Sequence, residues 1–133
     1  MVDKTQEVYL VPSELGEIDE ELLEPGATVI LLNSDTWGQG AFETGRKLME
    51  GFLAALAEAA AGVRAVVLVN RGVLLGDEGP ARHSLDALER QGVEILVCSV
   101  SAREHGVVPI VGRQVALFHI VQTLLRAKKV ITP

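Results

Sequence analysis

Cys98 is the residue of this chain with the clearest capacity for chemistry. It is the single cysteine, and it follows the apolar run of residues 93–97. Such a run predicts a buried strand, which would deliver the thiol to the turn at the strand's end. A thiolate in that place would be a nucleophile, whereas a covered thiol would act as a small apolar side chain. The residue types alone leave both interpretations open.

The residues that follow Cys98 favour the reactive interpretation. Ser101 and Glu104 have the spacing of a capping box, which predicts a helix that begins just behind the thiol. The positive end of that helix would favour thiolate over thiol. Arg71 or Arg103 could add further positive charge near the sulfur.

Apolar runs alternate with amphipathic segments along most of the chain. Strands are predicted at residues 28–32, 65–69, 93–97 and 130–132, and helices at about 42–61, 80–91 and 116–127. The last helix is expected to bury Leu117, Val121, Leu124 and Leu125, and residues 107–114 are expected to be irregular. Uniformly apolar strands separated by helices indicate a mostly parallel sheet with both faces covered. The sequence therefore predicts a single three-layer α/β domain of flavodoxin-like type.

This fold class predicts where a site would lie. Ligands of open α/β sheets bind beyond the carboxyl ends of the strands, where the strand order reverses. If the first and third strands flank that point, the loop of residues 33–40 meets the segment that begins at Cys98. The candidate residues around Cys98 are then Asn33, Asp35, Thr36, Trp37, Gly38, Asn70, Arg71, Ser99, Ser101 and Arg103. Backbone N–H groups of these loops could hold an anion.

Several of these residues have simpler structural roles. Asp35 and Thr36 are more readily explained as caps of the first long helix than as ligands. Trp37 would be either a lid over the thiol or, as we slightly favour, a residue buried between subunits. Arg71 could pair with a surface carboxylate such as Asp77.

Metal and cofactor chemistry find little support in the sequence. A single cysteine excludes an internal disulfide and a cysteine-based metal cluster. His83 and His119 lie on separate predicted helices, without metal-ligand spacing. His105 precedes Gly106 after one helical turn, so we expect it to be exposed to solvent rather than paired with the thiol. A flavin is disfavoured because aromatic residues are only 4% of the chain and Asp35 would repel a phosphate. We therefore expect no metal and no cofactor.

Length and charge set further bounds. The chain has 133 residues and a formal net charge of −6, the size of one ordinary domain. The acidic excess lies in residues 1–27, an acidic arm that precedes a nearly neutral body, residues 28–133. This distribution argues against nucleic acid as a partner. Without a signal-peptide pattern or an apolar stretch long enough for a bilayer, we expect a cytoplasmic protein with no membrane partner.

Five segments in order resemble a known family. They are Ser34-Asp35-Thr36-x-Gly38-x-Gly40, Leu48-Met49-x-x-Phe52, Val69-Asn70-x-Gly72-Val73, the run from Glu89 to Cys98 with Gly92-Val93-Glu94-Ile95-Leu96, and Lys129-Val130-Ile131-Thr132. Together they resemble the DsrE-like domain of YedF-type proteins, within the DsrE/DsrF/DsrH sulfur-relay superfamily. The resemblance covers about residues 28–133.

The resemblance implies a function. Active members of the superfamily carry sulfur as a persulfide on a cysteine of this loop and form small oligomers, and YedF-type proteins are linked to selenium metabolism. Carried over, Cys98 would bear the sulfur, the chain would form homo-oligomers, and donor and acceptor proteins would be its partners. The YedF-type pattern has a second cysteine where this chain has Ser101. It also includes a Cys-Pro motif, which residues 1–133 do not contain. The alternative is a non-catalytic DsrE-like oligomeric module, for binding or regulation, that has lost transferase activity.

Overall fold

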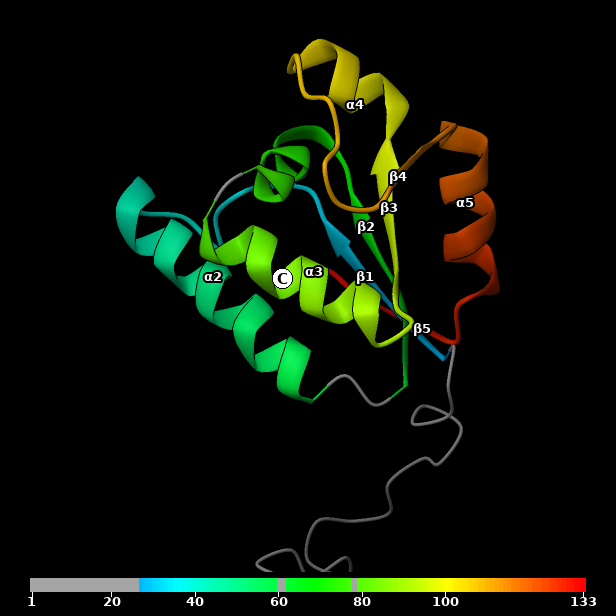
Figure 1. Cartoon of the computed structure of the whole chain (residues 1–133), viewed down its shortest axis with the longest axis horizontal. Coiled ribbons are helices and arrows are strands. Elements are labelled where there is room, and N and C mark those ends of the chain that lie inside the picture. The colour runs from blue at the N-terminus through cyan, green and yellow to red at the C-terminus, as the bar shows by residue number, and fades with distance from the viewer. Residues whose placement is uncertain (1–26, 60–61, 78) are drawn as a thin grey trace, which may run out of the picture.

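Five parallel strands form the centre of the molecule (Figure 1). The computed structural model describes residues 27–59, 62–77 and 79–133. The acidic arm, apart from Ala27, and the predicted end of the first helix at 60–61 therefore lie outside the described residues. The strands are β1 (Thr28–Leu32), β2 (Val63–Leu68), β3 (Glu94–Cys98), β4 (Arg113–Val115) and β5 (Lys129–Ile131). Their order across the sheet is β4-β3-β2-β1-β5, and every neighbouring pair is parallel.

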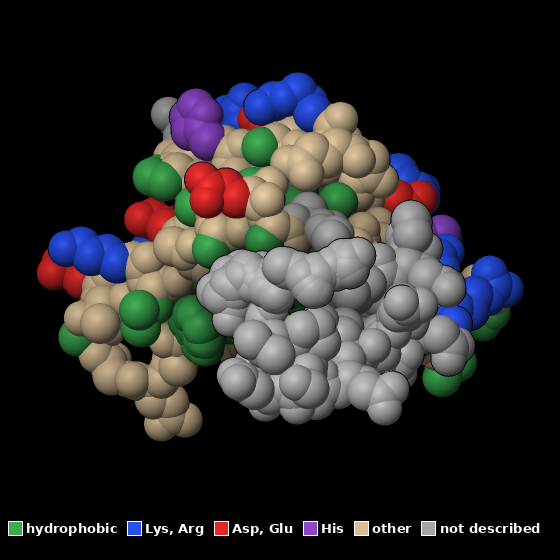
Figure 2. Space-filling model, turned by 90° about the horizontal axis from the view of Figure 1, so that it is seen from below, with side chains coloured by type: hydrophobic (Ala, Val, Ile, Leu, Met, Phe, Trp, Pro, Cys, Tyr) green, Lys and Arg blue, Asp and Glu red, His purple; other side chains and the backbone are tan. Residues whose placement is uncertain are grey.

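Helices cover both faces of this sheet, which confirms the predicted three-layer α/β class. One face packs against α2 (Phe42–Glu58) and α3 (Pro80–Arg90), and the other packs against α5 (Leu117–Arg126). The short η2 (Asn70–Gly76), a 3₁₀ helix, and α4 (Ser99–Glu104) follow the carboxyl ends of β2 and β3 (Figure 1). Figure 2 views the molecule from below, and basic, acidic and hydrophobic side chains are interspersed on this face.

The pleat of each strand divides the core into two parts. Successive side chains of a strand point to opposite faces, so Ile30 packs on the α2–α3 side while Val29 packs on the α5 side. Both are essentially unexposed. This double burial explains why the strands show no polar alternation in the sequence.

The predicted signals for α3 are confirmed at both ends. Pro80 occupies the start of the helix. At the other end Gly92 adopts a φ of 96°, its N–H donates to the Glu89 carbonyl and the Val93 N–H donates to the Leu88 carbonyl. These two hydrogen bonds form a Schellman motif, which requires a left-handed residue best supplied by glycine.

Three expectations about the elements were wrong. The first and third strands are not neighbours, because β2 lies between them. Part of the segment expected to be irregular forms β4, an edge strand too short to give a periodic signal in the sequence. The last helix buries other residues than expected, namely Ile120 and Thr123, with Leu124 half-buried. Leu117, Val121 and Leu125 are exposed and form an apolar outer stripe of α5.

Candidate functional site

Cys98 is the last residue of β3, and its side chain is covered. Its exposure is 3%, and it belongs to the apolar cluster on the α5 side, together with Val115 and Ile120. Val115 is its register partner on the edge strand β4. The residues after Cys98 led us to expect an accessible thiol at the mouth of a turn. The structure instead covers it.

The helix behind Cys98 begins earlier than predicted. α4 starts at Ser99, so Cys98 itself is the N-cap residue and Ser101 already lies within the first turn. The predicted capping box of Ser101 and Glu104 is therefore wrong. The Ser101 hydroxyl oxygen instead accepts a hydrogen bond from the backbone N–H of Asn70, with an N–O distance of 2.7 Å.

Asn70 connects β2 to α4. Its side-chain oxygen lies 3.0 Å from Nε2 of His105, at the end of α4. His105 is thus half-buried and hydrogen-bonded, and our expectation of an exposed histidine was wrong. Among the described residues Asn70 is the single non-glycine residue with a positive φ, 50°. We call Cys98, Ser101, Asn70 and His105 the thiol cluster.

The surroundings of Cys98 favour its ionised form. Burial raises the pKa of the thiol, but the Ser101 hydroxyl, the backbone N–H groups of Ser101 and Val100, and the charge of Arg103 together outweigh it. The pKa of Cys98 therefore lies below its ordinary value. The contacts of these donors with the sulfur are looser than a well-formed cap hydrogen bond. A thiolate accepts hydrogen bonds more strongly than a thiol, so the contacts are expected to tighten on ionisation.

Asp35 is the centre of a second polar cluster. Its carboxylate is 2% exposed, and it accepts hydrogen bonds from Arg71 Nε at 3.1 Å and Arg71 Nη2 at 3.0 Å. Arg46 Nη1 lies 3.3 Å from the same carboxylate. We call Asp35, Arg46 and Arg71 the carboxylate cluster. Its geometry overturns the predicted pairing of Arg71 with Asp77 and leaves Arg103, not Arg71, as the arginine that lowers the pKa of Cys98.

The loop of residues 33–40 does not cap α2. The N-cap residue is Ala41, without a side-chain hydrogen bond, so the predicted capping roles of Asp35 and Thr36 are wrong. Thr36 and Ser34 instead pair through their hydroxyl oxygens at 3.1 Å. Asp35 pairs with Arg46 and Arg71 instead of capping the helix, because a buried carboxylate requires cationic partners.

Trp37 lies in the loop after β1, and its ring contacts α2 rather than the thiol. Its ring meets Phe52 edge-on, with centroids 5.4 Å apart, and Phe52 packs against the core on the α2–α3 side. Cys98 belongs to the cluster on the opposite side of the sheet. Trp37 therefore does not form a lid over the thiol. Its burial between subunits stays a prediction.

The remaining predicted residues take less specific positions. Ser99 is the first residue of α4 and is half-buried. Asn33 and Gly38 are exposed after β1. The structure thus brings Asn70, Ser101 and Arg103 to Cys98, and it places Asp35, Arg71, Thr36 and Trp37 in contacts of their own.

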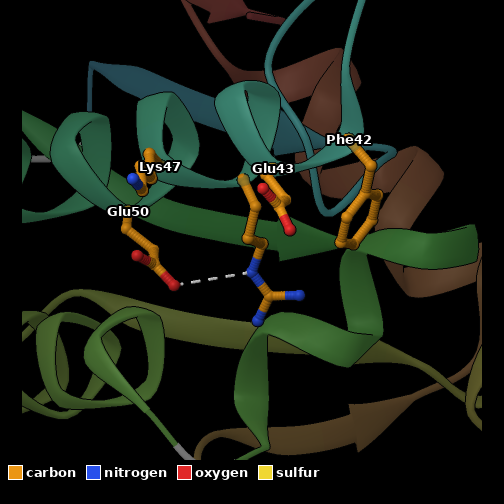
Figure 3. Close-up of a pocket in the computed structure, with 5 residues that line it drawn as sticks. Phe42, Glu43, Lys47 and Glu50 are labelled. Carbon is orange, nitrogen blue, oxygen red and sulfur yellow. Dashed lines mark ion pairs between the residues drawn. The ribbon is translucent and has the colours of Figure 1, made fainter.

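A shallow groove runs along the first turns of α2 (Figure 3). It is lined by Phe42, Glu43, Arg46, Lys47 and Glu50, none of which the sequence had marked. Glu50 forms an ion pair with Arg46, drawn as a dashed line in Figure 3, with a distance of 3.7 Å. The groove carries charges of both signs, and α2 packs on the face of the sheet opposite the Cys98 cluster, so we do not regard it as the reactive centre.

Arg46 and His105 are the polar residues that sequence reasoning missed. Arg46 is four residues from Glu50 on a helix, a spacing that is typical of a surface ion pair. His105 could only be connected with the site through Asn70, which is 35 positions away in the chain. No local signal could have linked either residue to its partner.

Comparison with known proteins shows the fold of this chain. No family model matches it, and no curated protein matches it at a significant level. A solved structure is similar, the crystal structure of the ychN protein from E. coli, with a TM-score of 0.59 and 19% sequence identity. The match covers 80% of this chain and 98% of that protein. The match shows a shared α/β fold, while the resemblance to YedF-type proteins continues to rest on sequence segments.

No helix among residues 27–59, 62–77 and 79–133 combines the length and apolar character that a bilayer crossing needs. Within the same ranges no three His, Cys, Asp or Glu side chains gather where they could hold a metal ion.

Proposed function

We propose that this protein is a sulfur-relay protein that carries a persulfide on Cys98. The observation that carries the proposal is the position of the thiol. It lies at the carboxyl end of a central strand, at the start of a helix, among donors that lower its pKa. The resemblance to the YedF-type segments and the DsrE-like fold support the same function.

The proposed reaction has two displacement steps. The Cys98 thiolate attacks the outer sulfur of a donor persulfide, the donor's S–S bond breaks, and the donor leaves as a thiolate. An acceptor thiolate then attacks the outer sulfur on Cys98, and Cys98 leaves as a thiolate. Neither step needs an external oxidant or reductant, because one S–S bond replaces another. Selenium in place of the transferred sulfur would follow the same steps and is the variant that the YedF-type resemblance suggests.

The cover over Cys98 must open for this reaction. Val115, its neighbour in register, belongs to the three-residue edge strand β4, which pairs only with β3 among the described strands. A short edge strand opens locally at a lower free energy than a central one. We infer that a displacement of β4 and the adjoining end of α5 exposes the sulfur to its donor.

Persulfide loading tests the proposal directly. The wild type is incubated with low-molecular-weight persulfides and with a cysteine desulfurase as protein donor, and its intact mass is measured. We expect a gain equal to one sulfur atom that reducing agent removes, and no gain in Cys98→Ser. Val115→Ala should load faster, because it thins the cover while keeping the thiol. The absence of an adduct from every donor in both thiol-containing proteins would refute the relay function.

A non-catalytic binding module is the second candidate. It is favoured by the 3% exposure of Cys98, which is compatible with a purely structural thiol. The rate of alkylation in the folded protein separates the two functions. A relay protein reacts through local opening, faster than it unfolds globally, whereas a structural thiol reacts only at the rate of global unfolding.

Self-association is part of both candidates. One stripe of α5 is apolar and exposed: Leu117 is 52%, Phe118 71%, Val121 44% and Leu125 80% exposed. These residues recur at helical spacing, and large exposed apolar surfaces mark interaction sites. We propose that a second copy of this chain covers this stripe. Sedimentation should show an oligomer in the wild type and a monomer in Leu125→Glu, while Leu48→Glu on the exposed face of α2 should remain oligomeric. A monomeric wild type at micromolar concentration would exclude the interface.

A further inference from the structure

We propose that Asn70 is a positioning residue for Cys98: its backbone N–H fixes the Ser101 hydroxyl so that the hydroxyl proton turns toward the sulfur, and His105 holds Asn70 in place. This inference rests on the proposed function, because it explains how the thiolate of a relay protein is stabilised. It assigns a role to two residues that are far apart in the chain, Asn70 at the start of η2 and His105 at the end of α4.

The Ser101 hydroxyl can form only a limited set of hydrogen bonds. A serine hydroxyl has one proton to donate and two lone pairs that accept. The Asn70 N–H occupies one lone pair at a distance of 2.7 Å, short for a hydrogen bond of this type. The hydroxyl proton cannot point toward that N–H, so it is directed to the remaining side. The Ser101 hydroxyl is also the strongest of the contacts that favour the ionised form of Cys98.

The backbone of Asn70 adopts a left-handed conformation. A φ of 50° is unfavourable for most residues, although asparagine tolerates it better than others. Such a conformation persists where surrounding contacts determine it. Here the amide side chain bonds to His105 Nε2 at 3.0 Å, and the turn is closed by the Gly72 N–H, which donates to the Val69 carbonyl at 2.8 Å. The N–H of Asn70 is thereby aimed at Ser101.

Charge is not the main cause of the lowered pKa of Cys98. The elements around Cys98 carry several titratable or charged groups: Arg103 and Glu104 of α4 with His105 at its C-cap, Arg71 of η2, Arg113 of β4, His119 and Arg126 of α5, Glu94 of β3 and Arg64 of β2. Arg71 and Arg113 pair with Asp35 and Glu94, and Arg103 is the only one of these groups that acts on the thiol by charge, as the weakest contribution. Neutral hydrogen-bond donors are therefore the principal stabilisers, and their orientation decides how strongly they act.

The test measures the pKa of Cys98 from the rate of alkylation by iodoacetamide as a function of pH. Ser101→Ala removes the donor, and the acid dissociation constant should fall about tenfold. Asn70→Ala disfavours the positive φ and misplaces the N–H, and we expect a fall of about threefold or more. Ser101→Thr keeps a hydroxyl and should restore the wild-type profile.

Two further variants separate positioning from folding. Asn70→Gly keeps the left-handed backbone and its N–H but removes the amide, and His105→Ala removes the same hydrogen bond from the other side. Each should shift the pH profile upward by less than Asn70→Ala, and the double variant should shift it no further than one alone. His83→Ala, an exposed histidine on α3, is the matched control and should leave the profile unchanged. Denaturant midpoints recorded in parallel identify any variant that is simply unfolded.

The outcomes are distinguishable from those of the proposed function. If Ser101→Ala shifts the profile but Asn70→Ala and His105→Ala do not, Ser101 acts alone and the positioning role is overturned. If Ser101→Ala leaves the profile unchanged, the inference also fails, whether or not Cys98 accepts sulfur. If the profiles shift as expected while wild type never loads a persulfide, the relay function fails and the positioning role stands.

Discussion

Two neighbouring residues, Asn70 and Arg71, serve two different polar clusters. Asn70 contacts Ser101 and His105 in the thiol cluster, and Arg71 holds Asp35 in the carboxylate cluster. The carboxylate cluster pairs a buried charge with two guanidinium groups. The thiol cluster surrounds a neutral, ionisable side chain with hydrogen-bond donors that gain most when it loses its proton.

This difference indicates that the two neighbouring residues of η2 have different roles. A carboxylate held by two arginines has its interactions complete, so it fixes the loop after β2 to the start of α2 and contributes mainly to stability. The thiol cluster is complete only when the sulfur is negative, so it favours a reactive state. Substitutions in the carboxylate cluster should therefore change stability, and substitutions in the thiol cluster should change the acidity of Cys98.

Gly72→Ala should have the largest effect and should disturb both clusters. A Cβ at this position would overlap the backbone carbonyl oxygen of Leu32, which cannot move without disrupting β1. We expect a loss of about 3 kcal/mol in the free energy of unfolding, measured by denaturant titration. Gly51→Ala is the control: nothing lies near its Cβ on α2, and the change should stabilise by about 1 kcal/mol. Equal stabilities of the two variants would contradict the close approach.

Asp35→Ala should lower stability without changing the acidity of Cys98. Breaking a fully buried ion pair costs about 3 kcal/mol or more. Here Arg71 is 51% exposed and Arg46 is 25% exposed, so both can regain water, and we expect a loss of about 2 kcal/mol. Chemical denaturation measures the loss, and the alkylation profile of Cys98 should remain that of wild type. A shifted profile would show that the clusters are coupled.

Ionisation of Cys98 should make stability depend on pH. Burial raises the pKa of this thiol, but the donors around Ser101 and Arg103 outweigh it, so the folded pKa lies below the unfolded value of about 8.5. A lowered pKa contributes stability that is present above the unfolded pKa and is lost as pH falls through the folded pKa. The unfolding free energy of wild type relative to Cys98→Ser should rise over that window, by about 1.4 kcal/mol for each tenfold gain in acidity.

Denaturant titrations at a series of pH values measure this rise. Asp35→Ala serves as a control, because it should keep the same dependence on pH at a lower stability. A difference between wild type and Cys98→Ser that stays flat or decreases toward pH 8.5 would show that the fold does not favour the thiolate.

Arg71→Lys should have the smallest effect. A lysine keeps the charge but cannot form the two parallel hydrogen bonds that the guanidinium donates to Asp35. We expect a loss of about 1 kcal/mol or less, since half of the side chain is exposed to water. Thermal unfolding measures it. A loss that exceeds the one in Asp35→Ala would mean that Arg71 has a further partner.

Much of the fold was predictable because its signals are local. The apolar runs of β1 and β3 and the start of α3 at Pro80 match the expected elements to within a residue or two. The site was predictable only in part. Cys98, Ser101 and Arg103 come together as neighbours along the chain, whereas the contacts of Asp35 with Arg46 and Arg71 join segments that no pattern connects.

The sequence by itself determined the alternation of buried strands and amphipathic helices, and with it the end of the sheet at which Cys98 lies. These are consequences of hydrophobic periodicity and chain direction, which are properties of short segments. Only the tertiary structure decided that β2 separates β1 from β3, that Cys98 is covered beside Val115, and that Asn70 bonds to α4. Those outcomes depend on packing and hydrogen bonding between residues far apart in the chain, which compete for partners only once the fold has formed.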